Sequence, residues 1–108
     1  MMKRKLGVHQ KAMLLEALRR YSRFHRDEKL TIAWTGLGSF SQHETVYNAG
    51  LMTYATSPNP GYMTWWRLTE KGAEIVQKWL DAGYTHRNIE DDLNYYELLS
   101  QDVYYENT

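Results

Sequence analysis

Positively charged side chains in the first third of the chain are the residues best suited to chemistry, because guanidinium and ammonium groups bind phosphates. Residues 1–30 carry nine Lys or Arg against three Asp or Glu. A helical wheel for residues 9–26 places most of these cations on one side and an apolar face on the other. We expect the cationic side to bind phosphate. Its members are Lys11, Arg19, Arg20, Arg23 and Arg26.

Negative charge collects at the other end of the sequence. Residues 81–108 carry one Arg and seven Asp or Glu, so the formal net charge is zero although the two ends differ in sign. This asymmetry indicates a basic surface for phosphates and an acidic end that repels them. An equally good interpretation is a pair of solvated helices of opposite charge.

Catalytic and metal-binding patterns are missing from the sequence. The four histidines, at positions 9, 25, 43 and 86, have no spacing that would let them ligate one metal ion, and there is no cysteine. Asp91 and Asp92 are adjacent, so their side chains would diverge on a helix. No Gly-x-Ser-x-Gly motif occurs, and Gly36-Leu37-Gly38 lacks the other residues of a phosphate-binding loop. We therefore expect no enzyme, no metal and no cofactor.

Size and hydropathy predict one domain. The 108 residues are 43% hydrophobic and 14% aromatic, which is enough for a single core and argues against disorder. No apolar run approaches the length of a membrane span, and the N-terminus lacks the apolar region of a signal peptide. We expect a cytoplasmic protein that does not bind membranes.

Four segments are predicted to be helical. The helix over 9–26 leaves only Leu15 on its polar flank, and a last helix is expected over 88–100 with Asn88 as its cap. Ser41 and Glu44 form a capping-box pattern for a short helix over 42–49. Thr69 should cap a helix over 70–82. Gly50 and Gly83 should end the second and third helices. The apolar face of the first helix comprises Met13, Leu14, Ala17, Leu18, Tyr21 and Phe24, and that of the last comprises Ile89, Leu93, Tyr96 and Leu99.

Strands 51–56 and 62–68 flank a Pro/Gly loop and should form a β-hairpin. Residues 27–40 are consistent with a turn followed by a short strand or a short helix. The tail after residue 100 should fray unless Val103 and Tyr104 dock.

Both faces of the hairpin are apolar, because side chains alternate along a strand. Trp66 and Leu68 should face the core, so the opposite side would be exposed as a protein interface. The alternative is that the last helix covers this side with Tyr95, Tyr96 or Leu99. The candidate interface residues are Met52, Tyr54, Met63, Trp65 and Tyr95.

The order of elements resembles the winged helix-turn-helix domain of MarR-like and PadR-like bacterial regulators. The matching segments are Ala49-Gly50-Leu51-Met52, where a recognition helix would end, and Arg67-Leu68-Thr69-Glu70-Lys71-Gly72, where a wing would end. The resemblance implies an α+β winged helix over about residues 9–82, with an extra acidic C-terminal helix and tail over 84–108.

The resemblance also implies a DNA-binding regulator of bacterial or mobile-element origin. Phosphate contacts would come from Arg67 together with Lys11, Arg19, Arg20 and Arg23, and base contacts from Gln42, His43, Thr45 and Asn48. The alternative function is a protein-interaction module on the same fold, such as a phage-encoded inhibitor of the anti-CRISPR type. The partner would then be double-stranded DNA or a host protein, and the C-terminal helix could form a homodimer.

Overall fold

The computed structural model describes residues 2–32, 34–35, 40–54, 66–90 and 92–107. The chain folds into helices and two small sheets, so the predicted α+β class is confirmed. In chain order the elements are β1 (Met2–Lys5), α1 (Val8–Arg20), a π-helical turn (Tyr21–His25), a 3-10 turn (Leu30–Ile32), β2 (Trp34–Thr35), α2 (Phe40–Asn48), β3 (Met52–Tyr54), β4 (Trp66–Leu68), α3 (Glu70–Asp81), α4 (Asp92–Ser100) and β5 (Tyr104–Asn107).

The predicted hairpin is confirmed over its described residues. β3 and β4 are antiparallel, with Met52 opposite Leu68 and Tyr54 opposite Trp66. β2 pairs with the other edge of β4, which gives the strand order β2-β4-β3. The hairpin loop lies outside the described residues.

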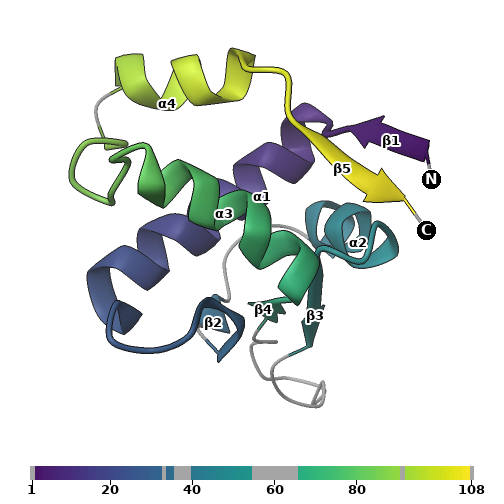
Figure 1. Ribbon diagram of the computed structural model, residues 1–108, viewed down its shortest axis with the longest axis horizontal. Helices are drawn as coiled ribbons and strands as arrows, with labels where there is room; N and C mark the ends of the chain where they lie inside the picture. The colour runs from purple at the N-terminus through teal and green to yellow at the C-terminus, as the bar shows by residue number, and fades with distance from the viewer. Residues whose placement is uncertain (1, 33, 36–39, 55–65, 91, 108) are drawn as a thin grey trace.

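The second sheet joins the two ends of the chain, because β1 pairs antiparallel with β5 (Figure 1). Of the two outcomes predicted for the tail, fraying or docking, the structure shows docking, because the Val103 carbonyl accepts a 2.7 Å hydrogen bond from the Leu6 N–H and Tyr104 begins β5. Tyr105 is buried, and the N-terminal strand supplies backbone partners for the C-terminal one. Neither MKRK nor YYEN alternates between apolar and polar residues, so the sequence pattern does not reveal these strands.

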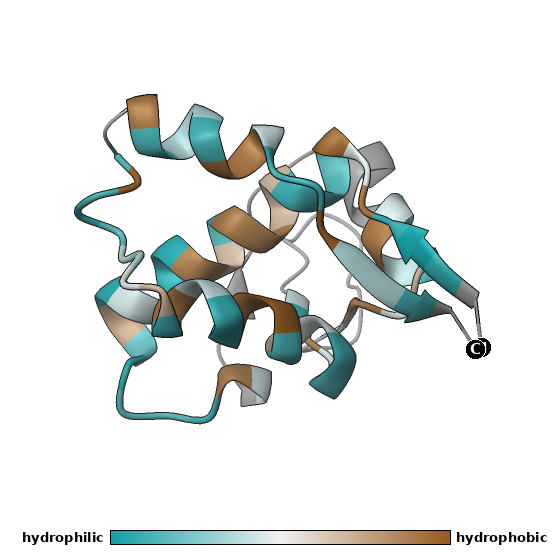
Figure 2. Ribbon diagram, turned by 45° about the horizontal axis from the view of Figure 1, so that its top comes forward, coloured by the Kyte–Doolittle hydropathy of each residue, from teal (hydrophilic) through white to brown (hydrophobic). Residues whose placement is uncertain are grey.

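Helices α1 and α3 cross the middle of the molecule, with α4 on one side and the three-stranded sheet on the other (Figure 1). In Figure 2 the hydrophobic residues of α1 and α3 lie in the centre, where the two helices pack together. α4 packs on α1. The alternative that the last helix covers the outer face of the hairpin is therefore wrong.

The junction between β4 and α3 forms as the sequence predicts. The Thr69 hydroxyl accepts a hydrogen bond from the Gly72 N–H at 3.2 Å and donates one to the Gly50 carbonyl at 2.6 Å. Gly50 has φ +74°, the left-handed conformation that ends α2. Gly72 packs so closely on Leu51 that a Cβ would lie 2.1 Å from the Leu51 carbonyl oxygen.

The end of the first helix differs from the prediction. The regular α-helix stops at Arg20 and continues as the π-helical turn. A π-helical turn contains more residues than an α-helical one, so it rotates the side chains that follow out of the α-helical phase. Phe24, which was predicted to lie in the core, is consequently 59% exposed. Leu15 was predicted on the polar flank, yet it is fully buried because α2, α3 and α4 all pack against α1.

The C-terminal helix also differs from the prediction. It is described from Asp92 onward, and Asn88 caps a preceding turn through its side-chain oxygen. Of the predicted apolar face, Ile89 is buried and Leu99 is half-buried against the core, whereas Leu93 is 80% and Tyr96 65% exposed, so the prediction holds only in part. Leu98, which lies off that face, is fully buried. The segment is apolar on two sides, and periodicity cannot choose between them; packing on α1 selects the side that carries Leu98.

Candidate functional site

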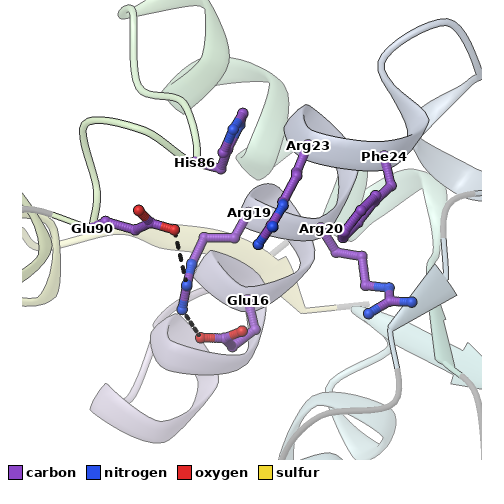
Figure 3. A pocket seen from close by; sticks show the side chains of 7 residues that line it. All are labelled: Glu16, Arg19, Arg20, Arg23, Phe24, His86 and Glu90. Atoms are coloured by element: carbon purple, nitrogen blue, oxygen red, sulfur yellow. Dashed lines mark hydrogen bonds and ion pairs between the residues drawn. The ribbon is translucent and has the colours of Figure 1, made fainter.

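A hollow of about 120 Å³ lies at the C-terminal end of α1 (Figure 3). We call it the arginine pocket. α1 supplies one wall, the π-helical turn supplies the second, and the connection from α3 to α4 supplies the third. Its lining residues are Glu16, Arg19, Arg20, Arg23, Phe24, His86 and Glu90.

Arg19 holds this pocket together. Its guanidinium lies 3.0 Å from a carboxylate oxygen of Glu16 and 3.5 Å from one of Glu90, as the dashed lines in Figure 3 show. The first pair lies within α1 and the second joins α1 to the segment before α4. Two carboxylates therefore offset the charge of Arg19. Its role is structural, because it connects α1 to the segment before α4.

Arg20 and Arg23 are arranged differently, because both guanidinium groups lie over the Phe24 ring. The distances from their central carbons to the ring centroid are 5.2 Å and 5.0 Å. Such distances are within the range of cation–π attraction. Arg23 is exposed, and in the described part of the chain it forms no salt bridge. Its positive charge is thus open to an anion from solvent.

His86 closes the pocket on the third side. Its backbone N–H donates a 2.8 Å hydrogen bond to the Ser22 hydroxyl, and its Nδ1 lies 3.2 Å from the same oxygen. These two contacts fix the α3–α4 connection on the π-helical turn. Sequence reasoning placed neither His86 nor Glu90 in a site, since only the fold brings them to α1. One local signal in the sequence could have indicated the pocket: the aromatic residue Phe24 lies among the basic residues of the segment RRYSRFHR.

Lys11 is not part of this pocket, and its assignment as a phosphate contact is wrong. The side chain is only 5% exposed. Its Nζ donates hydrogen bonds to the carbonyl oxygens of Leu99 and Gln101, the latter at 2.8 Å. These carbonyls belong to the end of α4, where a cation also interacts well with the helix dipole. Lys11 therefore fastens α4 to α1.

Arg67 is exposed on β4 and also lies outside the arginine pocket. In the sheet it stands opposite Thr53 on one side and Trp34 on the other. The five predicted phosphate contacts therefore divide among three places.

The predicted base-reading residues all belong to α2. Thr45 and Asn48 are exposed, while the side chains of Gln42 and His43 lie outside the described part. α2 packs beside the N-terminal end of α1, where the Gln10 side chain donates to the Thr45 carbonyl at 3.2 Å (Figure 1).

Arg19 leaves α1 on the side opposite Gln10. The two residues are separated by about two and a half helical turns, or roughly 13 Å along the axis. Because α2 contacts Gln10, the structure does not bring α2 and the arginine pocket onto one surface. A straight duplex that lies on α2 would therefore point away from Arg19.

The predicted protein interface does not form as a single patch. Met52 is 1% exposed and packs in the core, because its register opposite Leu68 turns it inward. Met63, Trp65 and the Tyr54 side chain lie outside the described residues. Tyr95 is half-buried on α4, and burial raises the pKa of its phenol.

No family model matches this sequence, and searches of curated proteins and of solved structures also give no match. The resemblance to winged-helix domains therefore stays a prediction. In the described part of the chain, none of the helices has the length and apolar character needed to cross a bilayer. Among the same residues, no group of three or more His, Asp or Glu side chains could hold a metal ion.

Proposed function

We propose that this protein binds nucleic acid, with the arginine pocket contacting the phosphates. The observation that carries the proposal is the state of Arg23, which is exposed, lies over the Phe24 ring, and has no salt-bridge partner in the described structure. Phosphate contacts by arginine supply most sequence-independent affinity for nucleic acids. Arg26 and Arg87, which are close to pocket residues in sequence, are also exposed.

The winged-helix resemblance supports the same class of function. A basic helix, a short helix, a hairpin and a capped helix follow one another as that resemblance implies. A cytoplasmic regulator encoded by a bacterium or a mobile element would suit it, and this role remains part of the proposal. The separation of α2 from the arginine pocket argues that the phosphate contacts operate independently of base reading by α2.

Fluorescence anisotropy tests the proposal. Labelled duplex and single-stranded oligonucleotides are titrated at low salt and then at increasing salt. We expect Arg23→Gln to weaken binding and to lower the slope of log K against log salt by about 1. Arg4→Gln is the matched control, because Arg4 is exposed on β1, away from the pocket. Absence of salt-dependent binding at low salt, or equal effects of both substitutions, would contradict the proposal.

A second candidate function is a protein-interaction module, and the outward face of α4 favours it. Leu93 and Tyr96 are both strongly exposed there, one turn apart, and Glu97 adds a negative charge. Burying each apolar side chain in a partner would contribute about 1.5–3 kcal/mol. The partner would be a second copy of this chain or a host protein, as for an inhibitor of the anti-CRISPR type.

Sedimentation equilibrium separates these partners. A homodimer through α4 predicts concentration-dependent association that Leu93→Lys abolishes. A monomer at all concentrations would leave a different protein as the partner.

A further inference from the structure

A second hollow, of about 440 Å³, lies between α3 and the C-terminal strand. Residues 104–106 of β5 form one wall and residues 70–78 of α3 form the other, and we call it the β5 groove. In both ribbon views β5 runs between β1 and α3 (Figures 1 and 2), so the groove follows the edge of β5 that faces away from β1. It shares no lining residue with the arginine pocket, and an inference about it is independent of nucleic acid binding.

The backbone of β5 directs hydrogen-bonding groups into this groove. The Leu6 N–H donates a 2.7 Å hydrogen bond to the Val103 carbonyl, so these two residues form a hydrogen-bonded pair of the ladder. Such pairs alternate along antiparallel strands, and Tyr105 is therefore the next β5 residue that bonds to β1. The N–H and C=O groups of Tyr104 and Glu106 point the other way. Among the described strands β5 pairs with β1 alone, so two donors and two acceptors are available to an added strand.

The two open edges of this sheet differ in how well they resist pairing. β1 carries Lys3, Arg4 and Lys5 in succession, and charged residues of this kind protect an edge against strand addition. β5 has the sequence YYEN, with a single charge and with Tyr104 53% exposed. β5 is thus the edge that can accept a further strand.

The walls of the β5 groove indicate what kind of molecule could bind there. Three lysines and three glutamates are among its lining residues, so the groove offers no excess of positive charge to nucleic acid phosphates. A second copy of this chain would bring its own core behind its β5, because Tyr105 is buried on the inner face of that strand, and α3 borders the groove where that core would have to fit. A lone extended segment of another protein meets neither obstacle.

The side chains that border the groove specify the segment further. Glu106 is exposed and forms no salt bridge in the described structure, so a Lys or Arg opposite it would be favourable, as Lys3 is on the β1 side. Tyr105 and Ile75 are 8% and 5% exposed, so an aliphatic residue opposite Tyr105 would extend the core.

We infer that the β5 groove binds an extended segment of a partner protein, of low net charge, as a third strand of the β1–β5 sheet. Main-chain hydrogen bonds to Tyr104 and Glu106 supply the affinity, and the residues opposite Tyr105 and Glu106 supply the selectivity.

The test uses the peptide acetyl-Thr-Lys-Val-Ile-Thr-amide, whose antiparallel pairing places Lys opposite Glu106 and Val opposite Tyr105. The peptide is added to the full chain, and amide hydrogen exchange is followed by NMR. In the free protein the Tyr105 amide should be protected by β1, whereas the amides of Tyr104 and Glu106 should exchange fast. We expect the peptide to slow exchange at both of these amides.

Matched controls exist for the peptide and for the protein. N-methylation of the peptide at Lys and Ile removes the N–H groups that bond to β5 and should weaken binding at least about tenfold. N-methylation at Val removes an N–H that points away from β5 and should have little effect. Glu106→Gln should weaken binding about threefold, whereas Glu97→Gln, at an exposed glutamate on α4, should not. Circular dichroism of each variant confirms that it is folded.

Four results would overturn the inference. The first is unchanged exchange at Tyr104 and Glu106 at the highest peptide concentration, and the second is equal weakening by the two kinds of N-methylation. The third is protection of both amides that rises with protein concentration in the absence of peptide, which would assign the edge to a second copy of the chain. The fourth is the same protection produced by oligo(dT), which would assign the groove to nucleic acid.

Discussion

Replacing Gly72 by alanine tests the packing of α3 on the hairpin. We expect the substitution to destabilise the fold, whereas Gly→Ala inside a helix usually stabilises it. Inside a helix, Gly→Ala normally stabilises by about 1 kcal/mol. At Gly72 the new Cβ would lie 2.1 Å from the Leu51 carbonyl oxygen, whereas real Cβ atoms stay at least 3.0 Å from such neighbours. The obstacle is backbone, so a change of rotamer cannot relieve it.

The Leu51 carbonyl is also held in place. It accepts a 3.1 Å hydrogen bond from the Thr69 N–H, while the Leu51 N–H donates to the Val46 carbonyl at 2.9 Å. Moving α3 away would disturb the Thr69 cap and the buried contacts beneath it. Overpacking costs about 1–3 kcal/mol and a lost cap about 1 kcal/mol. After subtracting the usual gain from alanine, we expect a net destabilisation of about 1–3 kcal/mol.

Urea and thermal unfolding followed by circular dichroism measure this effect. For a chain of this size the expected fall in Tm is roughly 4–12 °C. Gly7→Ala is the control, because the nearest atom to its Cβ would be a Gln10 side-chain oxygen at 3.7 Å, an ordinary contact. It should change the free energy of unfolding by less than about 1 kcal/mol. If Gly72→Ala leaves the protein as stable as the wild type, α3 does not approach Leu51 as described.

Two further predictions concern the attachment of the C-terminal segment. Lys11→Met should destabilise the fold by about 2–3 kcal/mol, because it leaves the Leu99 and Gln101 carbonyls without their donor; hydrogen exchange should then quicken in α4, and unchanged protection there would contradict the contact. Lys5 lies 2.9 Å from Asp102, and the hydrogen bond it makes holds the pKa of that carboxyl below 3.8. The stability that this pair contributes is therefore present above pH 3.8 and is lost as pH falls through the lowered pKa. A carboxyl NMR titration measures the pKa of Asp102, and Lys5→Gln should raise it back to the ordinary range.

Local sequence signals predicted the β4–α3 junction well. The Thr69 cap, the stop at Gly50 and the close approach at Gly72 each depend on a residue type whose backbone role is specific. The hairpin register followed from alternation, which turned Trp66 and Leu68 inward. At these positions, residue types close together in the sequence were sufficient to predict the local structure.

The candidate site was less predictable because it depends on contacts between distant segments. The helical wheel assumes 100° per residue, so the π-helical turn changed the position of Phe24. The sequence pattern placed Lys11 on the surface. Its hydrogen bonds to carbonyl groups form only because α4 packs against α1 in the fold. Glu90 contacts Arg19 and His86 contacts Ser22, each across more than sixty residues of chain, and no spacing in the sequence indicates these contacts.

An NMR titration tests the central claim most directly, because it reports which surface binds. Amide and arginine side-chain shifts of the labelled protein are recorded while oligo(dT) is added at low salt. We predict that the largest changes fall on Arg20, Arg23, Phe24 and His86, with little change at Thr45 in α2. Shifts concentrated on α2 or on the outer face of α4, with the arginine pocket unaffected, would contradict the account.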